Sequence, residues 1–318
     1  MNKSKKGGKI FNTASNGKNH GRKVIIDTDC GIDDAIAIMM AVRNGLVVRG
    51  ITTVSGNTEV EQVTVNVLRI LHFLGRGDIP VFKGAHRPFV KTSVSSAKIH
   101  GSDGLGDVGL PKAPFEAQIT SAPTAMYEIA KENPGITLIT LGPLTNVAMA
   151  LNLYPKLESL IGRIILMGGA LYKGNVTRFA EFNFYFDPEA AQFVFDSKVP
   201  LTIVPWDPIL QNIIMEKDLL KMVKNAGRIA EMIVALEQTP LAFMEEFYGV
   251  RASVFPDPVA VAYAIDEKVA KSKIIGNMKM ELNNNTMRGA SVLTEGERME
   301  IVTEVDPEVF KKIFVQTF

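Results

Sequence analysis

The sequence predicts an α/β fold: a mostly parallel, Rossmann-like open sheet flanked by helices, with a small antiparallel hairpin near the C-terminus. Two patterns predict the sheet. From about residue 22 onward, short apolar and β-branched runs alternate with helical segments, and turns containing Gly or Pro follow most of the runs. Right-handed crossovers between parallel strands account for this alternation. A third pattern, two strand-like segments flanking Asn283-Asn284-Asn285, predicts the hairpin.

Four strands are predicted in the first half of the chain, each from a compact apolar run. They cover residues 24–26, 47–54, 79–82 and 136–141. The helices predicted between them cover residues 35–42, 60–74 and 122–133. The first of these helices is apolar throughout, as suits packing against a sheet. The second places Val63, Val67 and Ile70 on one face, and Pro134-Gly135 stops the third.

The alternation continues in the second half. Strands are predicted at 161–167 and 199–204, and the hairpin strands at 278–282 and 290–293. Helices are predicted at 144–153, from Asp187-Pro188 onward, and at 217–248, 257–265 and about 307–315. Proline is well tolerated in the first helical turn, where its missing N–H has no helical partner, and the aspartate before it can cap the helix.

A long segment, residues 84–115, interrupts this pattern. It is rich in Gly, Ser, Pro and Lys, and it contains His100 in the run His100-Gly-Ser-Asp-Gly-Leu-Gly106. A loop of this length inside a compact α/β protein is often functional. By itself, however, a loop histidine carries no functional assignment.

Composition narrows the class of protein. Of the 318 residues, 46% are hydrophobic and 22% charged, which is enough apolar content for a sizeable core. We expect residues 1–21 to be a flexible basic tail and residues 22–318 a single domain. The net charge of +1 does not favour binding to nucleic acid or to a membrane surface. A single cysteine, Cys30, suits a reducing compartment, so we expect a cytoplasmic protein.

Four aspartates follow the first predicted strand within eight residues: Asp27, Asp29, Asp33 and Asp34. This turn lies at the carboxyl edge of the sheet, where open α/β folds bind their ligands. Four like charges repel one another, and a hard divalent cation with oxygen ligands would neutralise them. A solvated acidic turn that caps a helix explains one or two of the four. It does not explain all four beside a buried strand.

Further polar groups follow later predicted strands or open a helix. Converging strand ends would bring them together around a small polyol, while the aspartates hold a metal. The backbone carbonyl of Leu141 could be one ligand, since hard cations accept peptide oxygens. The polar side chains of this set are Asn57, His100, Asn175, Glu181, Asn183 and Asp257.

At this point the residues resemble a known family. The run Asp27-Thr-Asp-Cys-Gly-Ile-Asp-Asp34 is similar to the N-terminal signature of the inosine-uridine nucleoside hydrolases, which are calcium-dependent N-ribohydrolases. Other blocks also resemble this family and occur in the expected order between residues 23 and about 265. They are Thr53-Val-Ser-Gly-Asn57, Ile99-His-Gly101, Leu141-Gly-Pro-Leu-Thr-Asn146, Met167-Gly-Gly-Ala170, Gly174-Asn-Val-Thr177, Ala180-Glu-Phe-Asn183 and Asp187-Pro-Glu-Ala-Ala191.

The resemblance implies hydrolysis of the N-glycosidic bond of ribonucleosides, giving ribose and a free nucleobase, by a calcium-activated water. It implies that Ca²⁺ is held by Asp29, Asp34, the Leu141 carbonyl and Asp257, and that Asp29 takes the proton of the attacking water. It places Asp27 behind these ligands as an orienting group. It also implies a homodimer or homotetramer and a role in purine or pyrimidine salvage. The implied ribose contacts are Asp33, Asn57, Met167, Asn175, Glu181 and Asn183.

One position departs from the family pattern. In pyrimidine-preferring and nonspecific members, a histidine precedes the last calcium aspartate and helps protonate the leaving base. Here Pro256 occupies that place, and proline has no proton to donate. Leaving-group activation must therefore come from His100, from Tyr248 or Arg251, or from a purine protonated in a stacked pocket. The preferred base is left open.

Two alternatives remain on sequence grounds. A phosphohydrolase of the haloacid dehalogenase type also has a strand followed by Asp-x-Asp, and would use Asp27 as a covalent nucleophile. It leaves Gly31-Ile-Asp-Asp34 unexplained, and no compelling downstream lysine block supports it. The second alternative is a non-catalytic, calcium-dependent nucleoside or ribose binder, which Pro256 keeps open.

Overall fold

The structure is a computed structural model that describes residues 21–90 and 97–318. Apart from Gly21, the predicted N-terminal tail lies outside the described residues. The strands are β1 Lys23–Thr28, β2 Val47–Thr53, β3 Val81–Lys83, β4 Ile136–Thr140, β5 Ile161–Met167, β6 Leu201–Val204, β7 Ile214–Met215, β8 Ala252–Ser253, β9 Ala270–Met280 and β10 Ser291–Val305.

The helices alternate with these strands over most of the chain. They are α1 Ile32–Arg43, α2 Val60–Leu74, α3 Ala97–His100, α4 Ala122–Glu132, α5 Thr145–Leu153, α6 Leu157–Leu160, α7 Phe182–Phe186, α8 Pro188–Asp196, α9 Trp206–Leu210, α10 Glu216–Val223, α11 Arg228–Tyr248, α12 Pro256–Ile265 and α13 Pro307–Thr317, with a 3₁₀ turn at Glu267–Val269.

The central sheet has eight strands in the order β3-β2-β1-β4-β5-β6-β10-β9. Neighbours from β3 through to β10 pair in parallel, and β9 pairs antiparallel with β10. The predicted class, a mostly parallel sheet flanked by helices, is confirmed. The strand order reverses between β1 and β4, because the chain builds outward from β1 in one direction and from β4 in the other. Ligands of open α/β sheets bind at such a reversal, beyond the carboxyl ends of the strands.

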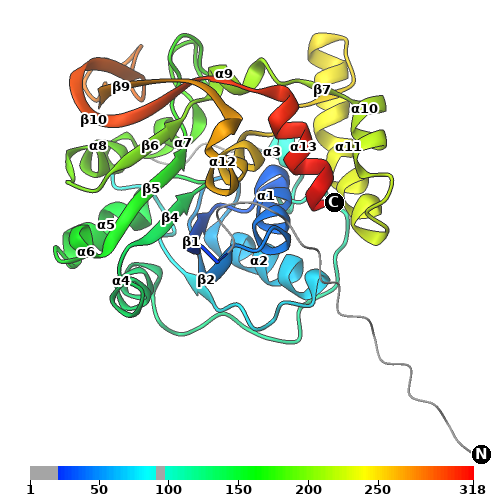
Figure 1. The fold of residues 1–318 in the computed structure, drawn as a ribbon, viewed down its shortest axis with the longest axis horizontal. Coiled ribbons are helices and arrows are strands. Elements are labelled where there is room, and N and C mark those ends of the chain that lie inside the picture. The colour runs from blue at the N-terminus through cyan, green and yellow to red at the C-terminus, as the bar shows by residue number, and fades with distance from the viewer. Residues whose placement is uncertain (1–20, 91–96) are drawn as a thin grey trace, which may run out of the picture.

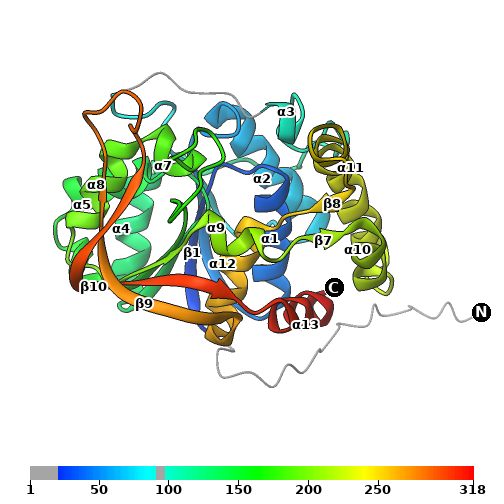
Figure 2. The same ribbon diagram turned by 90° about the horizontal axis from the view of Figure 1, so that it is seen from above.

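Helices cover both faces of the sheet (Figures 1 and 2). Seen from above in Figure 2, α4, α5 and α8 lie on one side of β1, and α1, α2 and α12 lie on the other. Side chains of β1 alternate between the two layers: Val24 and Ile26 pack in the α1–α12 core, and Ile25 packs in the α4–α5 core. A strand buried on both faces reads as a continuous apolar run, which is why β1 and β4 are recognisable in the sequence.

The C-terminal hairpin is present but is larger than predicted. Its strands start and end further from the turn, and β10 also pairs in parallel with β6, which joins the hairpin to the main sheet. The register between β9 and β10 shifts between Thr294 and Met299, and at Gly296 the backbone has φ +151°. These distant pairings, which local sequence does not encode, set the length of the hairpin.

The structure adds detail to the predicted elements. The region 217–248, predicted to be helical, contains two helices, α10 and α11, and Gly227, whose φ of +59° favours glycine, immediately precedes α11. The loop 84–115 contains the short helix α3. The pairing of β7 with β8, and the short helices α7 and α9, were not predicted.

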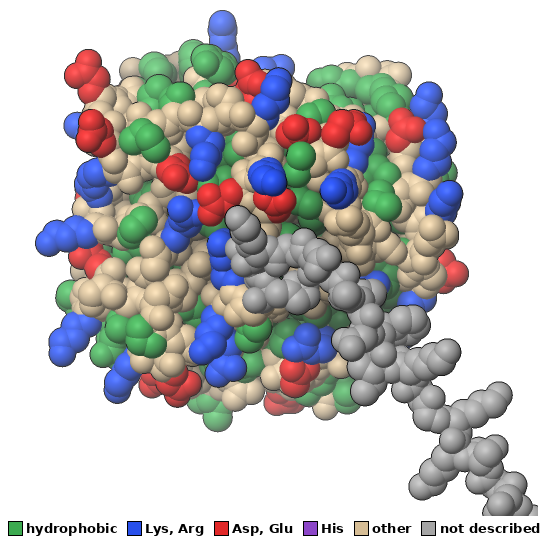
Figure 3. Space-filling model, in the orientation of Figure 1, with side chains coloured by type: hydrophobic (Ala, Val, Ile, Leu, Met, Phe, Trp, Pro, Cys, Tyr) green, Lys and Arg blue, Asp and Glu red, His purple; other side chains and the backbone are tan. Residues whose placement is uncertain are grey.

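Two surface properties bear on the kind of partner. On the face shown in Figure 3, Lys and Arg side chains are interspersed with Asp and Glu over the described part of the surface. Among the described helices, none combines the length and apolar character that crossing a membrane requires.

Candidate active site

A cavity of about 650 Å³ opens at the carboxyl ends of β1 and β4, where the strand order reverses. Every side chain predicted to bind a metal, bind substrate or take part in catalysis lines this cavity. The predicted orienting residue, Asp27, lies behind it. The lining residues from the predicted set are Asp29, Asp33, Asp34, Asn57, His100, Leu141, Met167, Asn175, Glu181, Asn183 and Asp257.

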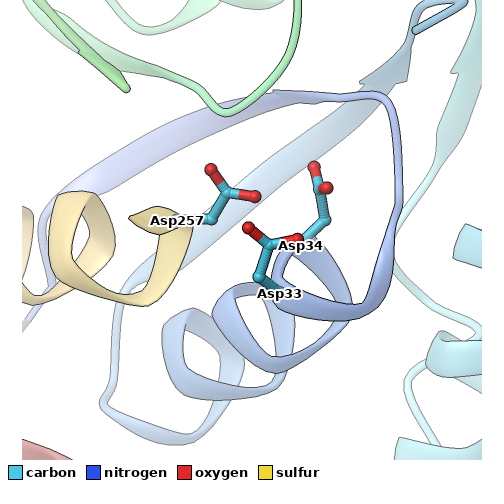
Figure 4. Close-up of side chains that lie close together, drawn as sticks. All are labelled: Asp33, Asp34 and Asp257. Carbon is cyan, nitrogen blue, oxygen red and sulfur yellow. The ribbon is translucent and has the colours of Figure 1, made fainter. Parts of the chain in front are cut away.

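Three carboxylates form the floor of the cavity. Asp33 and Asp34 come from the first turn of α1, and Asp257 comes from the first turn of α12; Figure 4 shows the three side chains gathered around one space. One ligand atom of each lies within 4.8 Å of the others. Oδ1 of Asp33 is buried and has no hydrogen-bond partner in the described part of the chain. An all-oxygen donor set with an unsatisfied buried oxygen fits a hard cation, so this group could hold a metal ion.

Hydrogen bonds fix Asp34. Its Oδ1 accepts a bond from Thr28 Oγ1 at 2.5 Å, and its Oδ2 accepts bonds from the backbone N–H of Gly31 at 2.9 Å and from Asn57 Nδ2 at 3.3 Å. Between these residues, Cys30 has φ +24°, which is unusual for a residue with a side chain. Strain of this kind persists where the surrounding structure holds the turn in place, and it is common at functional sites.

Asp29 is held by close backbone contacts. Its Oδ2 accepts a hydrogen bond from the Asn57 backbone N–H at 2.8 Å. A Cβ atom at Gly56 would lie 2.1 Å from Oδ2, and one at Gly142 would lie 2.7 Å from Oδ1. Glycine at both positions therefore lets the loops after β2 and β4 enclose this carboxylate.

Asp29 and the three floor carboxylates together make up the acidic floor, and burial, together with repulsion among them, raises their pKa values. Loss of water raises the pKa of Asp29 and of Asp257 well above its usual range, and neighbouring aspartates raise both further. Burial raises the pKa of Asp33 to about 6, and burial followed by repulsion from Asp33 raises that of Asp34. A bound cation would reverse both causes by favouring the ionised carboxylates.

Asp27 is fully buried beneath this floor. Its Oδ1 accepts hydrogen bonds from Thr52 Oγ1 at 2.6 Å and from Asn146 Nδ2 at 2.8 Å. Burial raises its pKa to about 7. Asp27 does not line the cavity and is 0% exposed, so it is poorly placed to attack a substrate as a covalent nucleophile.

Asn183 and Glu181 form the opposite wall at the start of α7. Nδ2 of Asn183 donates to the main-chain oxygens of Leu141 at 2.7 Å and Met167 at 3.2 Å. Glu181 accepts hydrogen bonds from the backbone N–H groups of Gly169 and Asn183, both at 2.8 Å. Burial raises its pKa to about 7. Nearby, Asn175 Oδ1 accepts from the Phe182 N–H at 2.9 Å, which leaves the Asn175 amide hydrogens available to a ligand.

His100 lies on α3 at the edge of the acidic floor. Its Nδ1 accepts a hydrogen bond from the Ile32 backbone N–H at 3.1 Å, so a hydrogen on the neutral ring belongs on Nε2. Burial lowers its pKa to about 4. Pro256 lines the cavity beside Asp257, where it supplies apolar surface.

Two other residues proposed to activate the leaving group differ in position. Tyr248 lines the cavity and is 66% exposed. Arg251 does not line it; its guanidinium is paired with Glu216 at 2.8 Å and Glu245 at 2.9 Å. Because its guanidinium is held in these two ion pairs outside the cavity, Arg251 is poorly placed to activate the leaving group.

Sequence reasoning missed Glu237, a buried carboxylate of α11 that lines the cavity. Its Oε2 accepts a hydrogen bond from Ser253 Oγ at 2.5 Å, and burial raises its pKa to about 8. A signal was available. Glu237 falls at helical spacing on the same face of α11 as Ile233 and Leu241, a buried stripe that is otherwise apolar.

The fold and the cavity together define a class: an α/β enzyme that places buried carboxylates and amides around a small polar ligand at the reversal of its sheet. The comparisons then identify the family. The family model for inosine-uridine preferring nucleoside hydrolases matches residues 24–312. The chain belongs to this family.

Relatives of known function agree. The chain is 35% identical over 286 residues to a pyrimidine-specific ribonucleoside hydrolase RihA of Citrobacter koseri, covering 89% of this chain and 88% of that one. Among solved structures, a plant nucleoside hydrolase, the PpNRh1 enzyme, matches with a TM-score of 0.88 and 30% identity over 93% of this chain and 98% of that one. A purine-preferring ribonucleoside hydrolase from Gardnerella vaginalis matches with a TM-score of 0.87 and 30% identity over the same shares.

The protein is therefore a ribonucleoside hydrolase that cleaves the N-glycosidic bond. Neither the phosphohydrolase nor the non-catalytic binder is favoured by these findings. The relatives include one specific for pyrimidine nucleosides and one that prefers purine nucleosides, so they do not indicate which base this chain prefers.

Proposed function

We propose that this protein hydrolyses ribonucleosides to ribose and free nucleobase with Ca²⁺ bound at the acidic floor of its cavity. The observation that carries the proposal is the gathering of all the predicted metal, ribose and catalytic residues around one cavity. Asp29, Asp34, Asp257 and the Leu141 carbonyl would hold the ion. When bound, calcium neutralises the carboxylates and lowers the pKa of water in its coordination sphere.

Asp29 acts as the general base. It is enclosed by the loops at Gly56 and Gly142, and its Oδ2 is oriented by the Asn57 N–H, so it cannot swing away from the cavity floor. It takes one proton from the attacking water as the oxygen of that water bonds to the anomeric carbon. Positioned base catalysis of this kind contributes about 10²–10⁴-fold to rate.

The ribose is held from two sides. Asp33 of α1 and Asn57 of the loop after β2 contact it on one side, and Met167, Asn175, Glu181 and Asn183 contact it on the other; all six line the cavity. Glu181 is held rigid by its backbone hydrogen bonds. When ionised, it stabilises the positive charge that develops on the sugar ring in an oxocarbenium-like transition state.

The test is a panel of nucleosides, including uridine and inosine, and of phosphate esters. Free base, reducing sugar and phosphate are each measured with and without a calcium chelator. We expect base and sugar in equal amounts from nucleosides, and loss of both with the chelator. Release of phosphate without base would contradict the proposal. Tight nucleoside binding without either product would instead support the binder.

We further propose that residues 22–318 form a single domain and that the protein is a cytoplasmic homodimer or homotetramer acting in nucleoside salvage. Support for the single domain is that β1 and the late strands β9 and β10 belong to one sheet. Light scattering on the purified chain tests the oligomeric state, and limited proteolysis, expected not to cut within 22–318, tests the domain.

A further inference from the structure

N-glycosidic hydrolysis needs a group that protonates the leaving nucleobase, because a base expelled as an anion is a poor leaving group. The part of the cavity that the structure describes offers few candidates. Tyr248 lines it but is 66% exposed, and its phenol is a weaker acid than a carboxylic acid. Pro256 has no proton to give, and Arg251 is paired with two glutamates outside the cavity. His100 uses Nδ1 to accept the Ile32 N–H, so it presents a neutral ring nitrogen, which is a weak acid.

Glu237 is the remaining carboxyl group of the cavity that neither the acidic floor nor the ribose wall employs. It is 2% exposed and lies on α11, and it lines the same cavity as the amides and carboxylate at the start of α7. The same helix contributes Pro240, Phe243, Met244 and Tyr248 to the lining. These side chains form an apolar wall that extends beyond Glu237 and suits the flat face of a nucleobase.

The hydrogen bonding of Glu237 leaves one oxygen for a ligand. Ser253 Oγ donates to Oε2 at 2.5 Å, and Oε1 has no hydrogen-bond partner among the residues that the structure describes. Ser253 belongs to β8 and does not line the cavity, although its neighbours Ala252 and Val254 do. Ser253 therefore positions the carboxyl group from behind, and a proton on Oε1 is the one that can be transferred.

The surroundings of Glu237 raise its pKa, so that it is in its acid form near neutral pH. Burial is the largest cause, and the negative charge of Asp33 on α1 adds to it; the Ser253 hydrogen bond acts in the opposite direction. His100 is the titratable cavity residue on α3, which packs against α11. A carboxylic acid with a pKa raised in this way can donate a proton near neutral pH.

We infer that Glu237 is the catalytic acid that protonates the departing nucleobase, in the role that Pro256 cannot fill; this inference rests on the proposed function. As the bond between the anomeric carbon and the base nitrogen breaks, its electron pair stays on the base, which takes the proton from Glu237 Oε1. The water oxygen bonds to the anomeric carbon and its proton passes to Asp29. Asp29 then releases its proton to solvent and Glu237 regains one from solvent, so the balance is water plus nucleoside giving ribose plus base.

The experiment compares two substrates on the calcium-loaded enzyme. A nucleoside such as uridine or inosine needs its base protonated, whereas 4-nitrophenyl β-D-ribofuranoside expels a phenolate that is stable as an anion. For Glu237→Gln we expect a loss of roughly 10²-fold or more in kcat on the nucleoside, and kcat within about 3-fold of wild type on the nitrophenyl riboside. The glutamine retains size and hydrogen bonding but transfers no proton. Glu231→Gln, on an exposed position of the same helix, is the matched control and should change neither rate.

Two further measurements separate a catalytic from a structural role. Wild-type kcat on the nucleoside should fall as pH rises through about 8, and Glu237→Gln should lack this alkaline limb. Ser253→Ala removes the bond that favours the carboxylate, so the limb should move to higher pH. Equal losses on both substrates, or an unchanged nucleoside rate, would overturn the assignment of Glu237 while leaving the hydrolase function standing. If wild type releases neither base nor nitrophenolate, the proposed function itself fails and the inference falls with it.

Discussion

Asn183 Nδ2 donates a hydrogen bond to the main-chain oxygen of Leu141 across 2.7 Å, joining the ribose wall of the cavity to a proposed calcium ligand. The first prediction follows from this bond. Asn183→Ala removes a group that orients the Leu141 peptide, and such supporting groups typically account for about 10–100-fold in metal affinity or activity. We expect a higher Kd for calcium, measured by calorimetry, and a higher KM for nucleosides. Asn152→Ala, on the exposed side of α5, is the control. An unchanged calcium Kd would show that Asn183 does not support the metal site.

Calcium should stabilise the folded chain. The carboxylates of the acidic floor repel one another and have raised pKa values, and a cation relieves this repulsion. At a free calcium concentration 100 times Kd, binding adds about 2.7 kcal/mol to the free energy of unfolding. Thermal melts with calcium, magnesium or chelator measure the shift. Asp34→Asn and Asp257→Asn should each reduce it. A melting temperature indifferent to calcium in the wild type would argue against the ion.

Asp29→Asn should separate binding from catalysis. At saturating calcium, the amide cannot take a proton from water, so we expect kcat to fall by about 10²–10⁴-fold with a much smaller change in ribose affinity. The measurement is single-turnover base release, with ribose binding followed in parallel. Base release that survives at near wild-type rate would contradict the assignment of Asp29 as the general base.

Local sequence predicted the acidic turn and the central strands, because both depend on residues close in the chain. Val24 to Ile26 form a β-branched run whose burial on both faces is evident from composition. The limits of the hairpin were not predictable in this way: β10 extends to Val305 because it pairs with β9 as far as Ala270, and its middle part also pairs with β6, whose residues lie about a hundred positions earlier. Tertiary pairing of this kind leaves little trace in a local pattern.

In the candidate site, too, features set by local sequence were predicted and features set by tertiary contacts were not. Aspartates that crowd into one turn are conspicuous, whereas Glu237 is a single charge in a helix that sequence treats as amphipathic. Its meaning depends on burial, on Ser253 arriving from β8, and on the cavity that α11 faces. The ion pairing of Arg251 likewise depends on tertiary structure, because Glu216 and Glu245 reach it from two different helices.

Glu237 also predicts a pH dependence of the stability of the folded protein. Burial raises its pKa to about 8 in the folded state, above the value of about 4.3 expected when the chain is unfolded. Between these values the folded state binds the extra proton, so the free energy of unfolding falls as pH rises. The stability that the protonated Glu237 contributes is therefore fully present below about pH 4 and lost by about pH 9. Urea midpoints across that range should fall less steeply in Glu237→Gln than in Glu231→Gln. Parallel slopes would indicate that Glu237 titrates normally.

Gly56→Ala tests how Asp29 is held. A Cβ at this position would lie 2.1 Å from Asp29 Oδ2 and 2.8 Å from its Cβ, so either the carboxylate or the loop after β2 must move. The Asn57 N–H that orients Oδ2 sits on the same loop, so both outcomes disturb the general base. A displacement of about 1 Å at a reacting group can cost 10²-fold in rate, and we expect kcat to fall by about that factor with calcium saturating.

The matched control is Gly276→Ala on β9, where the nearest atom to an added Cβ is Leu293 Cδ1 at 3.2 Å, on a side chain that can turn away. It should keep kcat within about 2-fold, because β9 is the outer strand of the sheet, far from β1 in the strand order. Comparable losses in the two variants would mean that Gly56→Ala acts through general stability. A Gly56→Ala enzyme with wild-type kcat would show that the enclosure of Asp29 is unimportant for proton transfer.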